Sequence, residues 1–149
     1  QLARVSIRRG EFDKAEKCLT QALELYEELY GENAVHINIA AVKFQQGVLA
    51  FQKEYLDQAF ILFSECLKIR QSVYAYCQGN HLEVSTVLHE LGCVELAQKR
   101  DEKACEFLSA ERDILDQLSE TTDQGERMYQ ARLTNLTWLR KCAKEEATK

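Results

Sequence analysis

The sequence predicts an all-α fold of antiparallel helical hairpins, and three observations lead to it. The 149 residues contain no proline and only 6 glycines, which suits long helices joined by short turns because proline ends helices and glycine marks turns. Apolar residues recur at three- and four-residue steps along most of the chain, which is the spacing of one helix face. Small residues recur with a fixed long period, which is typical of a repeat array.

Three kinds of residue keep a common period of 45 positions. The pairs with this separation are Gly47 with Gly92, Ala59 with Ala104, and His36 with His81. Ala15 precedes Ala59 by 44 positions. Because chance rarely keeps several markers in one register, we interpret the chain as successive copies of one unit.

Each period contains two amphipathic segments that flank a short polar turn, and turns this short make the two helices antiparallel neighbours. The predicted helices are 1–9, 13–30, 37–52, 57–76, 83–98, 102–118 and 124–145. They form about three hairpins and a C-terminal helix in a single domain, 1–149. The repeats are expected at 1–36, 37–81 and 82–123, with a terminal helix at 124–146, and we expect the chain to be a fragment of a longer protein.

Polar residues and glycines mark the helix ends. Asn80 precedes Glu83 by three positions, and Asp123 precedes Glu126 likewise, which is the spacing of a capping box. Residues tolerant of positive φ are expected in the longer links, namely Gly31, Gly79 and Gly125. His36 and His81 occupy equivalent places before a helix, where a capping or packing role is expected rather than metal binding.

The small residues resemble those of the tetratricopeptide repeat. In that family, a Gly or Ala in the first helix and an Ala twelve positions later let the two helices approach closely. The matching pairs are Ala3 with Ala15, Gly47 with Ala59, and Gly92 with Ala104, each followed four positions on by a large apolar residue, Leu19, Phe63 or Leu108. The resemblance implies a right-handed α–α superhelix that binds other proteins.

The long period is similar to that of kinesin light chains, whose repeats have about 42–45 residues, rather than to the common form of about 34. The segments that carry this likeness are ALELYEELYGE (22–32), CLKIRQSVYAY (66–76), HINIA (36–40), HLEVS (81–85) and LTNLTWL (133–139). Ile37 and Leu82 replace that subfamily's proline, and only Asn135 remains of its paired asparagines. The resemblance implies an adaptor role without naming a cargo motif.

Stacked hairpins expose an inner surface that is lined by the first helix of each repeat. The inward positions are Phe44, Gln45, Val48 and Gln52 in one helix, His89, Glu90 and Cys93 in the next, and Thr134, Asn135 and Trp138 in the last. Amides can bond to a main chain and aromatics can anchor side chains, so this strip suits an extended peptide or a partner helix. For His89, groove contact and plain exposure remain open alternatives.

Composition argues against other classes of function. The net charge of −5 disfavours nucleic acid, and no apolar run approaches the roughly 20 residues that cross a membrane. Catalytic motifs are absent from the sequence, and the 6 cysteines lack metal-chelating spacings. We expect no enzyme activity, metal or cofactor, and a reducing, cytoplasmic compartment in which most cysteines are small buried residues.

Three further alternatives stay open. Residues 101–126 hold nine acidic residues and 127–149 hold six basic ones, which indicates either two paired helices or an acidic patch for a basic partner. Trp138 either covers the core or forms an interface. The expected partner is a protein or peptide. The alternative is a structural segment whose groove is filled by its own chain, with dimerisation through exposed terminal helices.

Overall fold

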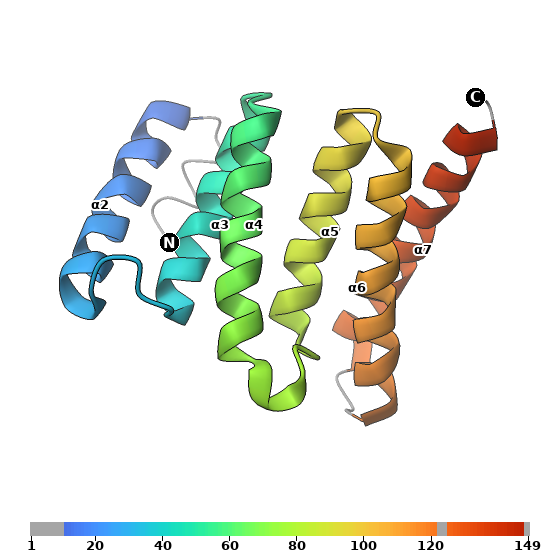
Figure 1. Cartoon of the computed structure of the whole chain (residues 1–149). Helices are drawn as coiled ribbons and strands as arrows, with labels where there is room; N and C mark the ends of the chain where they lie inside the picture. Colours follow the sequence, from blue (N-terminus) through green and yellow to red (C-terminus); the bar gives the residue numbers. More distant parts are fainter. Residues whose placement is uncertain (1–10, 122–124, 148–149) are drawn as a thin grey trace. The chain divides into compact units, whose positions relative to one another are not determined.

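The computed structural model describes residues 11–121 and 125–147, and these contain helices but no strand (Figure 1). The helices are α2 (Phe12–Tyr30), α3 (Ile37–Gln52), α4 (Leu56–Val73), α5 (Leu82–Ala97), α6 (Asp101–Thr121) and α7 (Gly125–Ala147). The predicted all-α fold is therefore confirmed. The helix predicted at 1–9 lies outside the described residues. The one predicted at 57–76 ends earlier, at Val73, and is followed by a 3-10 turn, Ala75–Cys77.

The chain divides into two compact units, 1–73 and 74–149. In the first unit, α3 packs along α4 and also against α2. In the second, α6 packs against both α5 and α7. The pairs α3–α4 and α5–α6 are the predicted hairpins, joined by the short turns that the polar breaks indicated.

The two helices of each hairpin touch at a glycine. A Cβ placed on Gly47 would lie 2.7 Å from Cε1 of Phe63, and one on Gly92 would lie 2.7 Å from Cγ of Leu108. Phe63 and Leu108 are both completely buried, so neither side chain has free space to move into. The 45-residue glycine spacing therefore reflects two equivalent points of close helix contact.

Apolar side chains form the core of each unit. In the first unit, α2 and α3 share a cluster of Ala15, Leu19, Val42 and Leu49. The second unit has two clusters, one of Leu82, Leu115 and Leu118 and one of Leu96, Ala104, Leu108 and Cys142. Trp138 packs against the last of these, which supports its role as a cover for the core.

A histidine caps each hairpin at its first helix. The Nδ1 atom of His36 accepts a hydrogen bond from the backbone N–H of Asn38 at 3.1 Å. His81 accepts from the N–H of Glu83 at the same distance. The predicted cap at Asn80 is therefore wrong, because His81 occupies the N-cap position of α5. Asp123 lies outside the described residues.

Both histidine rings lie flat on a tyrosine. The centroid distance is 3.7 Å for His36 on Tyr30 and also 3.7 Å for His81 on Tyr74. Stacking holds each imidazole over the first helical turn, so the ring is oriented before it accepts the N–H. His36 and His81, which are 45 positions apart, thus have the same structural role, namely a helix N-cap whose ring stacks on a tyrosine.

We expect His81→Ala to lower the free energy of unfolding by about 1–2 kcal/mol, because a cap bond and an aromatic contact are lost together. Urea titration followed by Trp138 fluorescence measures this loss. His81→Asn serves as the control, since asparagine can cap a helix but cannot stack. A variant with asparagine that is no more stable than the alanine variant contradicts the capping role.

Two of the three glycines that were predicted in links lie there, whereas the prediction for Gly125 is wrong because Gly125 is the first residue of α7. Gly31 and Gly79 adopt positive φ, at 100° and 77°, as expected for helix ends.

Arg132 Nη2 of α7 lies 3.0 Å from Asp116 Oδ1 of α6, so this pair supports the interpretation of an acidic helix beside a basic one. Each described helix is too short or too polar to cross a bilayer.

Candidate functional site

In the first unit, the predicted strip on α3 is partly used for packing. The Phe44 ring meets the Phe63 ring edge-on at 5.6 Å, and the Arg70 guanidinium lies 4.9 Å from the Phe44 centroid. Val48 packs against the core shared by α2 and α3. Gln45 is half-buried and Gln52 is exposed. Of these four residues, Gln45 and Gln52 are therefore the two whose side chains are not used in these packing contacts and can contact a partner.

In the second unit, predicted residues from α5 and α7 come together. The rings of His89 and Trp138 meet edge-on with centroids 5.9 Å apart. The Lys141 Nζ lies 4.9 Å from the Trp138 centroid, a distance at which a cation is attracted to an indole. Thr134 is exposed, and its hydroxyl donates to the Gln130 carbonyl.

A buried carboxylate joins the three helices beneath this contact. Glu111 Oε1 of α6 lies 3.0 Å from His89 Nδ1 and accepts a hydrogen bond from Asn135 Nδ2 at 2.6 Å. The same Asn135 nitrogen also donates to the Leu108 carbonyl at 2.8 Å. Glu111 and Asn135 are 4% and 1% exposed. The Asn135 amide therefore ties α7 to α6 and is not presented at the surface.

Glu111 was not among the predicted site residues, although the sequence carries a signal for it. It lies on the apolar stripe of its helix, between Leu108 and Leu115, and 45 positions after the buried Cys66. An acidic residue in such a place needs a partner, since an unpaired buried charge is strongly unfavourable. The partner was already among the predicted residues, namely His89.

The titration of His89 is set by its surroundings. Burial by itself lowers the pKa of His89, but hydrogen bonds to Cys93 and Glu111 and the charges of both groups outweigh this effect. The pKa of His89 is thereby raised from 6.5 to about 10. At neutral pH, the imidazole is therefore a cation paired with Glu111. The pKa of Glu90 is also raised, mainly because this side chain is buried. The positive charge of His89 lowers the Glu90 pKa in part, and the negative charge of Glu111 raises it further.

The His89 pKa predicts a pH dependence of stability. Because the folded-state pKa of about 10 exceeds the unfolded value of 6.5, the stabilisation is complete below pH 6.5 and is lost as the pH rises toward 10. We expect the free energy of unfolding to fall between pH 7 and 9 with a slope of up to about 1.4 kcal/mol per pH unit. Urea titrations of the wild type and of His89→Gln measure it, and equal slopes in the two proteins contradict the assignment.

The face around His89 and Trp138 presents aromatic and polar side chains. Its accessible groups are a tryptophan edge, a hydroxyl, the half-buried Glu90 and the half-buried Cys93. In the part of the chain that the structure describes, no three His, Cys, Asp or Glu side chains converge as metal ligands. The face therefore presents aromatic and polar contacts on a fixed framework.

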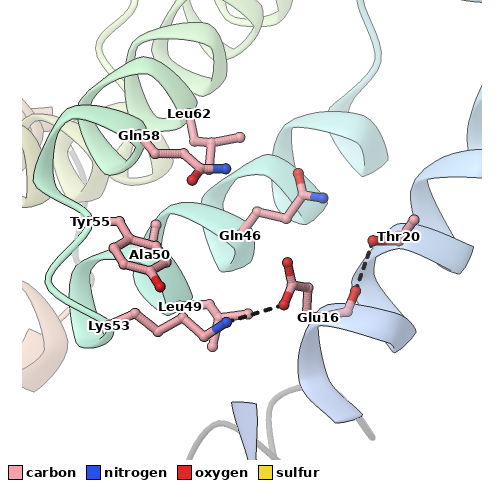
Figure 2. Close-up of a pocket in the computed structure, with 9 residues that line it drawn as sticks. All are labelled: Glu16, Thr20, Gln46, Leu49, Ala50, Lys53, Tyr55, Gln58 and Leu62. Carbon is pink, nitrogen blue, oxygen red and sulfur yellow. Dashed lines mark hydrogen bonds and ion pairs between the residues drawn. The ribbon is translucent and has the colours of Figure 1, made fainter. Parts of the chain in front are cut away.

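A second feature, which the sequence did not predict, is a pocket of about 230 Å³ in the first unit (Figure 2). It lies between α2 and α4 with α3 as its floor, and Gln46 and Gln58 line it. At its rim, Lys53 Nζ lies 3.1 Å from Glu16 Oε2. A further cavity of about 360 Å³ lies between the same three helices and is lined in part by Ile39, Ile69 and Val35.

Comparison with known proteins agrees with the helix pairing. The tetratricopeptide repeat family model matches residues 1–72, and no curated protein matches the chain. Repeats of this kind generally mediate protein–protein interaction. The matched segment contains part of the first unit and includes the α3–α4 hairpin with its Gly47 contact, so residues 1–72 are similar to tetratricopeptide repeats in both sequence and helix pairing.

Proposed function

We propose that the chain is a protein-interaction module that binds a peptide or helix of a partner on the face formed by α5 and α7. The observation that carries this proposal is the contact between His89 and Trp138, with Glu111 fixing the histidine from below. Tryptophan is a frequent source of binding energy at interfaces. Glu90, Cys93 and Thr134 border this contact as the polar groups of the same predicted strip.

The face is held in place before any partner arrives. His89 is fixed by Glu111, and Trp138 is fixed by His89, by Lys141 and by the core beneath it. A side chain that is already immobilised loses little conformational entropy on binding, so more of the contact energy appears as affinity.

The finer parts of the proposal rest on the long repeat. By its similarity to kinesin light chains, we propose an adaptor role in the cytoplasm, in which Gln45 and Gln52 of α3 bond to the main chain of a partner segment. The 6 cysteines, all free, support a reducing compartment.

The test is site-specific photo-cross-linking in the full chain within its native cell. A photoreactive amino acid at Thr134 is expected to capture a defined partner, whereas one at the exposed Lys103 of α6 captures none of it. Trp138→Leu retains an apolar side chain against the core but removes the indole, so it should reduce capture at Thr134 at least about tenfold. Urea titration verifies that this variant remains folded.

Two outcomes contradict the proposal. Equal capture from Thr134 and Lys103 shows that the face is not selective. Cross-links that join position 134 only to the chain's own protein favour the alternative, a structural segment whose groove is filled by its own chain or by a second copy.

A further inference from the structure

The repeat register explains why the first unit has space for the pocket of about 230 Å³ between α2 and α4. Ala50 and Leu62 line this pocket. The residues 45 positions later are Glu95 and Phe107, and both are larger. Glu95 is completely buried. At the place of the pocket, the first unit therefore lacks both side-chain volume and a carboxylate that the following repeat has.

A lysine supplies positive charge at the pocket. The Nζ atom of Lys53 lies 3.1 Å from Oε2 of Glu16, and these side chains are 22% and 61% exposed. In the second unit, Nη1 of Arg100 lies 3.7 Å from Oε1 of the buried Glu95. Each repeat thus has a cation beside an anion, but in the first unit the anion is an exposed glutamate of α2. An exposed ion pair is weak, so Glu16 can release Lys53 to a carboxylate that enters the pocket.

Polar groups line the rest of the pocket (Figure 2). The side-chain amides of Gln46 and Gln58 each have hydrogen-bond donors and an acceptor, and Tyr55 has a hydroxyl. The volume of about 230 Å³ corresponds to roughly eight water molecules at about 30 Å³ each. A short carboxylic acid with a polar far end therefore suits both the size of the pocket and its lining groups.

We propose that this pocket binds the carboxylate of a short polar acid, which is either a free small molecule or a glutamate side chain of a partner. Lys53 is the counter-ion, and the amides of Gln46 and Gln58 bond to the far end. The ligand supplies the carboxylate that Ala50 lacks. Residues 1–10 contain no aspartate or glutamate, so they do not provide this group. The site lies in the first unit and goes beyond the α5–α7 face of the proposed function.

The test is an NMR titration of the full chain with glutaramate, a short chain that has a carboxylate at one end and an amide at the other. Glutaramide has the same shape but an amide at both ends, so it is the matched control ligand. We expect saturable shifts of the Ala50 and Lys53 backbone signals with glutaramate, weakened by added salt. Glutaramide should cause none.

Three substitutions locate the bound carboxylate. Lys53→Gln should weaken glutaramate binding at least about tenfold, since a hydrogen bond between two charged groups is lost. Glu16→Gln removes the competing anion and should strengthen binding by up to about fivefold. Ala50→Glu fills the pocket with a carboxylate of the chain itself and should abolish binding. Ala41→Glu is the matched control, because it adds the same side chain at an exposed position of α3.

A blocked amino acid identifies the source of the carboxylate. N-acetyl-glutamate amide presents it as a residue in a protein does. Tighter binding of this compound than of glutaramate assigns the site to an acidic residue of a partner, and the reverse order assigns it to a free small acid.

Three results overturn the proposal. They are equal shifts with glutaramide, unchanged binding in Lys53→Gln, and binding that persists in Ala50→Glu. The NMR spectrum of each variant shows whether it is folded. If Ala50→Glu does not fold, Lys53→Gln and Glu16→Gln still decide the question, because the proposal requires them to change the affinity in opposite directions.

Discussion

Glu111→Ala is expected to lower the free energy of unfolding of the second unit by about 3–5 kcal/mol, which is the range for removal of one partner from a buried ion pair. The substitution leaves the His89 imidazole without its anion and removes one of the two acceptors of the Asn135 amide. We expect the lower end of the range at neutral pH, because His89 can release its proton once Glu111 is gone. Trp138, the only tryptophan, reports the transition by fluorescence in urea.

A variant drawn from the chain itself provides the control. Phe44 lies 45 positions before His89, and Cys66 lies 45 positions before Glu111. The preceding repeat therefore has an apolar pair where the second unit has His89 and Glu111. The double substitution His89→Phe, Glu111→Cys therefore transplants an apolar pair into the site. It should recover much of the stability lost in Glu111→Ala, because replacing both members of a buried pair costs far less than removing one. A double variant as unstable as Glu111→Ala contradicts this account.

Gly92→Ala is expected to destabilise the α5–α6 hairpin by about 1–3 kcal/mol, the usual cost of forcing a methyl group into a packed core. The new Cβ would lie 2.7 Å from Cγ of Leu108, and Leu108 is fully buried. Alanine also favours a helix over glycine by about 1 kcal/mol, so the observed loss is the difference between the two effects. The same change at Gly47, against Phe63, should have a similar result.

Shortening the opposing side chain tests this mechanism. Gly92→Ala combined with Leu108→Val should be more stable than the sum of the two single losses, because each change relieves the strain or the cavity that the other creates. Simple additivity in this double-mutant cycle indicates that the two positions are not in contact. Gly31→Ala is the comparison for backbone effects, since no atom lies within 4 Å of a Cβ there and its φ is 100°.

Helix positions could be predicted from sequence because they depend on local periodicity. The α3 helix begins at Ile37 and ends at Gln52, as predicted, and the other described helices differ by a few residues at their ends. The ends depend on particular contacts. The hairpin turns close on Glu54 and Lys99 with φ of 65° and 60°, which are residues that no glycine rule identifies.

The candidate site was predictable only in part. The register placed His89 and Trp138 on one strip, and their rings do meet. It also included Asn135 as a surface amide, although the structure buries it against Leu108 and Glu111. The prediction that the ten strip residues form a continuous groove stays a prediction, because the two units are described separately.

The sequence by itself determined the helices, their pairing and the 45-residue period, since helix periodicity and small-residue spacing are properties of neighbouring residues along the chain. Only the tertiary structure decided which polar groups serve the fold. Glu111 reaches His89 across 22 positions and Asn135 across 24. Such contacts depend on how each helix is rotated about its axis when it packs. That rotation follows from the fit of whole side-chain surfaces, which no local pattern encodes.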